Sequence, residues 1–566
     1  MIMRYTRFVL ISITLLISLS LFTCQDHKIE YFQGALSTVH PIATEVGRDV
    51  LVRGGNVADC AVAVGFTLAV VYPQAGNLGG GGFAVVYSKD SSLVTTLDFR
   101  EKAPLFATED MYLDSLGNPV VDASLFGYKA AAVPGTVAGL LELHHRFGLL
   151  PLNDLLSLAI ELAENGFAVD SVLASDLVDH MQALAEFEST REIFFRDGIP
   201  LRRGDTLVQT DLAEVLKRIA EYGASGFYGG RTADLLEQAC MANGGLITRT
   251  DLKEYQPRWR LPISCEYDDL RIFSMGPPSS GGILLAQIFN MLSQFSLPKN
   301  SPYNPVFVHL FAETCKRAYA DRAEYLGDFE FVDVPIRELT SLNYAVERIS
   351  DFNPVQATPS TEVEPGNLAG ESEQTTHYSI VDSYGNALAL TYTINASFGS
   401  KVVADSLGFF LNNEMDDFVI KPGVPNLYGL VGGQANKIAP QKRPLSSMSP
   451  TIVFKDDEPV MVTGSPGGSR IITTVALSIL YYYHFNFNLE RTVFAPRYHH
   501  QHLPDAIYYE PGAFDEETIK NLIDLGHTMT ERTPYGCLNV LARKTSTSTW
   551  QAEADNRRGG QAVVIE

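Results

Sequence analysis

Two segments rich in β-branched and aromatic residues, 375–382 and 386–394, flank a short Ser-Tyr-Gly turn. This pattern predicts an antiparallel hairpin. If the turn centres on Tyr384, residue i lies opposite residue 768 − i, so Thr375 faces Thr393. Facing residues have Cβ atoms about 5 Å apart, so the two hydroxyls could share a hydrogen bond. The chain is thereby predicted to contain a β-sheet with paired threonines at one end of a hairpin.

A threonine in this position could act as a nucleophile. Asn395 is expected to project from the same face as Thr393. The Thr375 hydroxyl could attack the Gln374 carbonyl, and hydrolysis of the resulting ester would free an α-amine with a pKa of about 7.7. That amine could then serve as the general base for its own hydroxyl. The alternative is that both threonines are ordinary sheet residues, since threonine is common in strands.

The rest of the chain indicates a layered α+β protein. Helical and strand patterns alternate over residues 40–345, a second hairpin is expected at 451–464, and the uncharged segment 471–485 is typical of a core helix. Residues 351–374 contain three prolines, five acidic residues and no basic residue. This composition predicts a solvated, mobile linker directly before Thr375.

The amino terminus has the features of an export signal. Arg4 and Arg7 precede an uncharged apolar run at 8–22, which is short for a membrane span. The run ends at Leu-Phe-Thr-Cys24, which is similar to the lipobox of bacterial lipoproteins. We therefore expect residues 1–24 to direct export, with the body either periplasmic or held at a membrane through lipidated Cys24. Simple signal cleavage and an uncleaved anchor are the alternatives.

Charge and cysteine content exclude other classes. The chain has 43 basic and 66 acidic residues, a net charge of −23 and a pI near 4.9. Such a protein repels phosphate backbones, so no nucleic-acid partner is expected. The five cysteines after Cys24 are far apart and show no C-x-x-C spacing, which favours buried thiols over a zinc site.

Several long segments together resemble the γ-glutamyltransferase (γ-glutamyl transpeptidase) family. Residues 374–400 are similar to the processing-site motif of that family. Further similar segments lie at 53–64, 77–86, 97–104, 411–418, 421–433, 442–453, 464–471 and 499–505. The resemblance covers the chain from about residue 36 nearly to its end.

This resemblance implies a four-layer αββα N-terminal-nucleophile hydrolase fold made as one precursor. It implies cleavage between Gln374 and Thr375 into a large subunit, 25–374, and a small subunit, 375–566, which remain associated. Thr375 takes the role of nucleophile and Thr393 that of its hydroxyl partner.

The resemblance also implies how a γ-glutamyl donor is held. Arg100 suits the donor α-carboxylate because a guanidinium is a charged, two-toothed donor, and Ser446 and Ser447 would add neutral donors. Taken singly, each of these residues would more simply be a surface ion pair or a turn residue. The positions implied for the donor ammonium are Asp417, Glu414 and Asn395.

Gly467 and Gly468 lie between a predicted strand and the apolar helix, where backbone amides could stabilise an oxyanion. The alternative is an ordinary permissive turn. Residues 422–433, around Tyr428, resemble the lid loop of the family. Histidines 499, 500 and 502 belong to a family pattern that implies a structural role and no metal. The sequon at Asn395 is discounted because it falls inside the site motif.

The sequence therefore predicts an exported γ-glutamyltransferase and glutathione hydrolase that needs no cofactor. Its substrates would be glutathione or other γ-glutamyl compounds, with water, amino acids or peptides as acceptors. One alternative is a cephalosporin acylase-like amidase of the same fold. The other is an unprocessed, non-catalytic binding protein.

Overall fold

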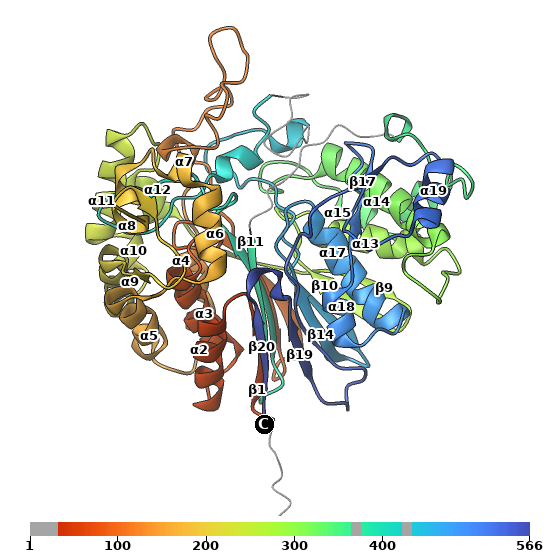
Figure 1. The fold of residues 1–566 in the computed structure, drawn as a ribbon, viewed down its shortest axis with the longest axis horizontal. Coiled ribbons are helices and arrows are strands. Elements are labelled where there is room, and N and C mark those ends of the chain that lie inside the picture. The colour runs from red at the N-terminus through yellow and green to blue at the C-terminus, as the bar shows by residue number, and fades with distance from the viewer. Residues whose placement is uncertain (1–31, 364–374, 422–432) are drawn as a thin grey trace, which may run out of the picture. The chain divides into compact units, whose positions relative to one another are not determined.

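Two antiparallel sheets pack face to face in the computed structural model, which describes residues 32–363, 375–421 and 433–566 (Figure 1). The seven-stranded sheet has the order β20 (Gln561–Ile565), β1 (Gly34–Thr38), β11 (Thr375–Asp382), β12 (Ala387–Thr393), β2 (Gly81–Ser88), β3 (Leu93–Phe99) and β8 (Arg258–Arg260). The six-stranded sheet has the order β19 (Gln551–Ala554), β18 (Asn539–Ala542), β14 (Glu458–Gly464), β13 (Thr451–Lys455), β10 (Leu270–Ser274) and β9 (Ile263–Tyr267).

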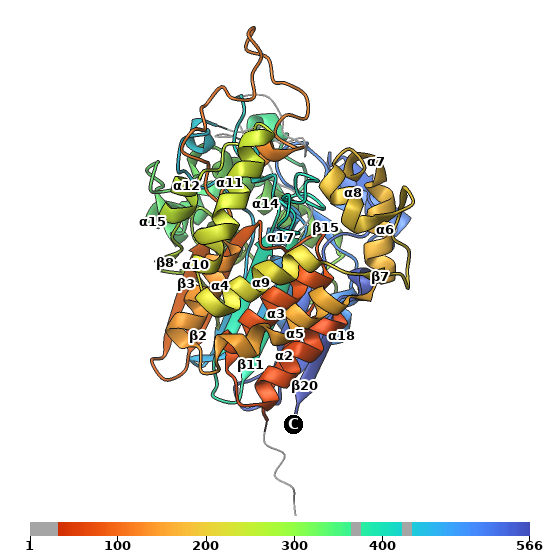
Figure 2. The same ribbon diagram turned by 90° about the vertical axis from the view of Figure 1, so that its left-hand side faces the viewer.

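Helices cover the outer face of each sheet. The helices α2 (Pro41–Val52), α3 (Val57–Val71), α4 (Thr136–Phe147), α5 (Leu152–Asn165) and α9 (Thr210–Tyr222) form the layer on the seven-stranded sheet (Figure 2). The helices α13 (Gly281–Leu292), α14 (Pro305–Tyr325), α17 (Arg470–Ile479) and α18 (Leu489–Phe494) form the layer on the six-stranded sheet. The predicted αββα architecture is confirmed, and residues Gln33–Ile565 form one compact unit.

Shorter elements complete this unit. The remaining helices are α6 (Ser171–Asp179), α7 (Met181–Leu184), α8 (Glu188–Phe194), α10 (Ser225–Tyr228), α11 (Gly230–Ala242), α12 (Arg249–Glu254), α15 (Ile336–Leu339), α16 (Leu342–Arg348) and α19 (Glu516–Asp524). A three-stranded sheet joins β15 (Tyr498–His499), β16 (Ile507–Tyr509) and β17 (Met529–Glu531). Two-stranded sheets pair β4 (Phe167–Ala168) with β7 (Thr206–Leu207) and β5 (Phe195–Arg196) with β6 (Ile199–Pro200).

The predicted hairpin is confirmed with its register. Thr375 pairs with Thr393, and the pairing continues to Val381 and Ala387 before the turn. The second hairpin forms as β13 and β14. The apolar segment after Gly468 forms the buried helix α17, which continues into one π-helical turn at Leu480–His484.

The two faces of β11 meet different environments. Tyr378 points toward the helical layer, where its hydroxyl donates to the Ala61 carbonyl at 2.9 Å. On the opposite face the Ser379 hydroxyl donates to the Asn539 carbonyl at 2.9 Å, and Asn539 Nδ2 donates to the His377 carbonyl. Polar groups therefore join the two sheets, and these bonds fix the strand that begins at Thr375.

The first half of the predicted linker, residues 351–363, is mostly exposed, but hydrogen bonds hold it to the rest of the molecule. Residues 351–363 pack against the molecule: the Ala357 amide donates to the Leu525 carbonyl at 2.6 Å, and the Ser360 amide donates to Asp505 Oδ2 at 2.7 Å. Ser360 is buried. Composition missed this because the partners lie about 150 residues further along the chain. Residues 364–374 lie outside the described residues.

The expected export signal, 1–24, with the lipobox at Cys24, also lies outside the described residues. In the part of the chain that the structure does describe, none of the helices is long and apolar enough to cross a bilayer. The cysteines 60, 240, 315 and 537 are buried, as predicted, whereas Cys265 is partly exposed.

Candidate active site

Thr375 begins β11 and Thr393 ends β12, so the hairpin register places both threonines at the same end of the sheet. Both are buried. The neighbouring strand approaches closely through the glycine-rich segment before β2. A Cβ atom on Gly80 would lie 1.9 Å from the Thr393 carbonyl oxygen, so only glycine fits there. The glycine-rich segment therefore allows close packing beside the threonine pair.

One pocket, which we call the first pocket, brings most predicted site residues together. Its lining residues are Arg100, Thr375, Thr393, Asn395, Glu414, Asp417, Ser446, Met448, Gly468 and Ile471. The free space in it is about 10 Å³, room for about one water molecule. The side chains that line the first pocket must therefore move apart before a ligand can enter.

Arg100 fills the first pocket with ion pairs. It follows β3, and its side chain reaches the short helix Glu414–Asp417, where Nη1 lies 2.6 Å from Glu414 Oε2 and Nη2 pairs with Asp417. Nη1 also lies 3.3 Å from Glu101 Oε2. All four side chains are buried. One guanidinium thus faces three carboxyl groups.

Sequence reasoning missed Glu101, although it lies in a segment that carries the family resemblance. Burial raises the pKa of Glu101 to about 8, and the nearby Arg100 opposes this rise. Glu101 therefore holds its proton at neutral pH. The Arg100 guanidinium then faces two carboxyl groups besides Glu101, namely Glu414 and Asp417. Buried carboxylates attract a cation, and a ligand ammonium is such a cation.

The serines and glycines predicted for the site lie around the same threonine. Ser446 lines the first pocket. Ser447 does not, but it is fully buried, and its hydroxyl has no hydrogen-bond partner among the described residues. Gly468 lines the first pocket and Gly467 lines a second one, each together with Thr375.

The backbone at Gly467 and Gly468 leaves two buried amides without an acceptor among the described residues. Gly467 has a φ of 134° and Gly468 a φ of 59°, both in the region that favours glycine. Their carbonyls accept from the first amides of α17, at 3.1 and 3.0 Å. Within the described part of the chain, neither glycine amide donates a hydrogen bond. Two unpaired N–H groups before a helix suit a developing oxyanion.

The second pocket lies on the other side of Thr375 and has a volume of about 280 Å³. Its lining residues are Thr375, Pro466, Gly467, Arg470, Thr533, Pro534, Tyr535, Gly536, Arg557 and Arg558. Apart from Thr375 and Gly467, sequence reasoning assigned none of them. Arg470 lies in the resembling segment 464–471, which was the one available signal.

Two predicted site residues, Gln374 and Tyr428, lie outside the described residues. The predicted structural histidines are buried and bonded to protein groups. His499 contacts Thr473 Oγ1 at 2.8 Å and Gln501 Oε1 at 2.9 Å, and His500 contacts Asp505 at 3.2 Å. Their contacts fit the structural role predicted for them.

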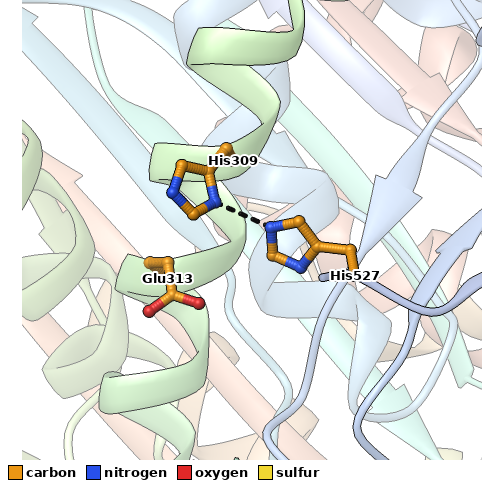
Figure 3. Close-up of side chains that lie close together, drawn as sticks. All are labelled: His309, Glu313 and His527. Carbon is orange, nitrogen blue, oxygen red and sulfur yellow. Dashed lines mark hydrogen bonds between the residues drawn. The ribbon is translucent and has the colours of Figure 1, made fainter. Parts of the chain in front are cut away.

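A further buried cluster has the composition of a metal site: His309, Glu313 and His527 (Figure 3). His309 Nε2 faces the Asn353 carbonyl oxygen at 2.9 Å and so carries the proton. His309 Nδ1 is left to accept from His527 Nε2, at 2.7 Å. Burial lowers the pKa of both histidines, that of His527 to about 3, so the pair is neutral.

Glu313 is also occupied. Its Oε1 lies 3.0 Å from Lys316 Nζ and accepts from the Thr358 amide at 3.2 Å, while Oε2 lies 2.6 Å from Arg317 Nη1. Every candidate ligand atom therefore has a protein partner, and two of these partners are cations. We interpret the cluster as a structural junction that holds the packed segment 351–363 to α14.

The four layers and a threonine at the start of a central strand define an N-terminal-nucleophile hydrolase. The cephalosporin acylase of Bacillus halodurans shares the fold, with a TM-score of 0.83 at 24% identity over 96% of this chain and 99% of that chain. The gamma-glutamyltranspeptidase of Helicobacter pylori superposes with a TM-score of 0.57 at 44% identity, covering 58% of this chain and 93% of that chain.

Sequence comparison gives the family. The gamma-glutamyltranspeptidase family model matches residues 43–565. The glutathione hydrolase proenzyme of Escherichia coli (strain K12) is 49% identical over 498 residues, 88% of this chain and 86% of that protein. The chain belongs to the gamma-glutamyltranspeptidase family.

Proposed function

We propose that this protein is a γ-glutamyltransferase that also hydrolyses glutathione. The observation that carries the proposal is the first pocket, where the Arg100 guanidinium and two carboxyl groups lie beside Thr375 at the start of β11. The carboxyl groups are those of Glu414 and Asp417. A γ-glutamyl donor carries a carboxylate and an ammonium on its α-carbon. Arg100 binds the first and Asp417 and Glu414 bind the second, so the donor replaces the internal ion pairs with matched external ones.

The precursor first cleaves itself. The Thr375 hydroxyl attacks the Gln374 carbonyl, and water hydrolyses the ester to give the large subunit, 25–374, and the small subunit, 375–566. The freed α-amine of Thr375 is then the general base for its own hydroxyl. Thr393, opposite in the register, orients that hydroxyl.

The catalytic cycle uses the same groups. Thr375 Oγ attacks the γ-carbonyl carbon, and the oxyanion accepts from the amides of Gly467 and Gly468. Ser446 and Ser447 add hydroxyl donors to the α-carboxylate, and Asn395 adds an acceptor for the ammonium. The leaving amine departs with a proton, and water or an acceptor amine resolves the γ-glutamyl ester.

Export completes the proposal. Residues 1–24 direct the precursor out of the cytoplasm, and the mature protein is periplasmic or lipidated at Cys24. Intact-mass measurement of the purified protein tests this and autoprocessing together. We expect a small subunit that begins Thr-Thr-His-Tyr and a large subunit that has lost its leader, with or without lipid mass.

Substrate choice separates the proposal from an acylase of the same fold. We expect release of p-nitroaniline from γ-glutamyl-p-nitroanilide to exceed that from glutaryl-p-nitroanilide, because the second substrate lacks the ammonium that Asp417 and Glu414 pair with. Preference for the glutaryl compound would defeat the proposal. A persistent single chain without activity would support the non-catalytic binding protein instead.

A further inference from the structure

We propose that Asn436 is a positioning residue for the donor, because its side-chain amide joins the part of the site that binds the ammonium to the part that binds the carboxylate. The first part is the short helix Glu414–Asp417, which we call the ammonium segment. The second part is 444–447, which we call the carboxylate segment. The inference rests on the proposed γ-glutamyl transfer and adds to it how the spacing of the two binding groups is set.

The Asn436 side chain is buried and uses both ends of its amide. Its Nδ2 donates to the Asp417 carbonyl at 2.6 Å, and its Oδ1 accepts from the Leu445 amide at 3.0 Å. A carbonyl only accepts and a backbone amide only donates, so these two partners fix which way round the side-chain amide lies. One side chain therefore connects the last residue of the ammonium segment to the residue directly before Ser446.

The carboxylate segment is anchored independently of Asn436. The Ser446 amide donates to the Pro278 carbonyl at 2.8 Å, and the Ser446 carbonyl accepts from the amide and the hydroxyl of Ser280, at 2.7 and 2.8 Å. The Ser280 hydroxyl in turn accepts from Nε of Arg322, on α14, at 2.8 Å. These bonds hold the carboxylate segment to the helical layer on the six-stranded sheet.

The end of the ammonium segment depends on Asn436 more directly. Besides the side-chain bond to the Asp417 carbonyl, the Asn436 carbonyl accepts from the Val419 amide at 2.9 Å. Arg100 also joins the two segments, because its Nε donates to the Pro444 carbonyl at 3.3 Å while its Nη2 pairs with Asp417. The donor replaces that ion pair. Asn436 does not line the first pocket, so its two side-chain bonds persist when the donor binds.

Loss of the Asn436 amide should therefore affect one charge of the donor. The carboxylate segment keeps its anchor, whereas Asp417 loses a bond that sets its distance from Ser446. Contacts to the donor ammonium weaken, and contacts to the donor carboxylate stay. Both charges are remote from the reacting carbonyl, so this binding is the same in the ground state and the transition state. Its loss should raise KM and leave kcat unchanged.

The test compares γ-glutamyl-p-nitroanilide with glutaryl-p-nitroanilide, which keeps the carboxylate and lacks the ammonium. In Asn436→Ala we expect the KM for the γ-glutamyl compound to rise about 10-fold with kcat unchanged, the size of one hydrogen bond to a buried group. The kcat/KM for the glutaryl compound should be unchanged. The inhibition constant of L-glutamate should rise by the same factor and that of glutarate should not. The two inhibitors give the comparison even if the glutaryl donor reacts too slowly to measure.

Asn436→Leu is a second variant, which keeps the volume of the side chain in case the alanine variant does not fold. Asn290→Ala is the matched control, because Asn290 is also buried and donates to a backbone carbonyl, that of Thr340 at 3.0 Å, but lines neither the first nor the second pocket. This control should change neither KM nor the inhibition constants.

An equal loss for both donors or both inhibitors, or failure of both variants to fold, would give Asn436 a general structural role and overturn the inference. An unchanged KM for the γ-glutamyl donor would overturn it as well. Failure of the proposed function itself would be distinct, since wild type would then release no p-nitroaniline from γ-glutamyl-p-nitroanilide.

Discussion

The two pockets that share Thr375 solve the binding of charge in opposite ways. In the first, Arg100 and its carboxylate partners satisfy one another, and about 10 Å³ of space is left. In the second, about 280 Å³ is open and the Tyr535 hydroxyl has no partner in the described structure. A pocket closed by its own ion pairs admits only a ligand that replaces both charges. An open pocket with a few fixed donors tolerates many ligands. The choice of γ-glutamyl donor is therefore expected to be strict, because only the first pocket requires both charges of its ligand.

The largest effect should come from the residue common to both pockets. We expect Thr375→Ala to remain one uncut chain with no activity, because the nucleophile for cleavage and for transfer is lost. Denaturing gel electrophoresis and p-nitroaniline release measure both outcomes. Thr376→Val is the matched control: Thr376 is buried next door, faces Gly76 instead of the pockets, and should be cut and active. Cleavage after Gln374 in Thr375→Ala would refute the assignment of the nucleophile.

The next largest effect is expected from Arg100→Gln, which should weaken donor binding in the first pocket alone. Loss of a buried charge partner typically costs 2–5 kcal/mol, so we expect kcat/KM for γ-glutamyl-p-nitroanilide to fall about 100-fold or more. Arg100→Lys keeps the charge but loses the two-toothed geometry, and should recover part of this loss. The KM for the acceptor glycylglycine should be unchanged in both variants. A changed KM for glycylglycine with a normal donor KM would contradict the assignment of Arg100 to the donor.

The difference between the pockets also marks what sequence could predict. The first pocket was predicted almost entirely, because its residues lie in long segments that resemble one family, and the hairpin arithmetic placed Thr375 opposite Thr393 without that resemblance. Tyr535 was missed. It lies in a short loop without periodicity, and only the packing of the two sheets brings it to a threonine 160 positions earlier.

Long-range contacts that composition does not report also fix the first half of the predicted linker. The Asp351 side chain is 60% exposed, and it still pairs with the buried Arg317 at 2.8 Å, while the Thr358 amide donates to Glu313. Residue composition reports what a segment can do alone. It carries no information on buried charged partners elsewhere in the chain, such as those on α14.

A smaller effect is expected in the pH dependence of the donor KM, which Glu101 should influence through Arg100. Since burial raises the pKa of Glu101 to about 8, this carboxyl is neutral below that pH and negative above it. Ionised Glu101 would compete with the donor carboxylate for Arg100, so the donor KM should rise several-fold between pH 7 and 9. In Glu101→Gln that part of the rise should vanish, and what remains belongs to the donor ammonium. An identical pH profile of the donor KM in wild type and Glu101→Gln would show that Glu101 does not affect donor binding by Arg100.

The smallest effect should come from Ser447, beside the first pocket. Its buried hydroxyl has no partner among the described residues, so a donor carboxylate would be its first acceptor. A neutral hydrogen bond contributes about 1 kcal/mol, so Ser447→Ala should raise the donor KM about 5-fold and leave the KM for glycylglycine unchanged. Ser478→Ala is the control, because that buried serine contacts the Val475 carbonyl and Thr463 Oγ1 and lines neither pocket. If Ser447→Ala instead altered the KM for the acceptor, Ser447 would not act on the donor alone, which would contradict its placement beside the first pocket.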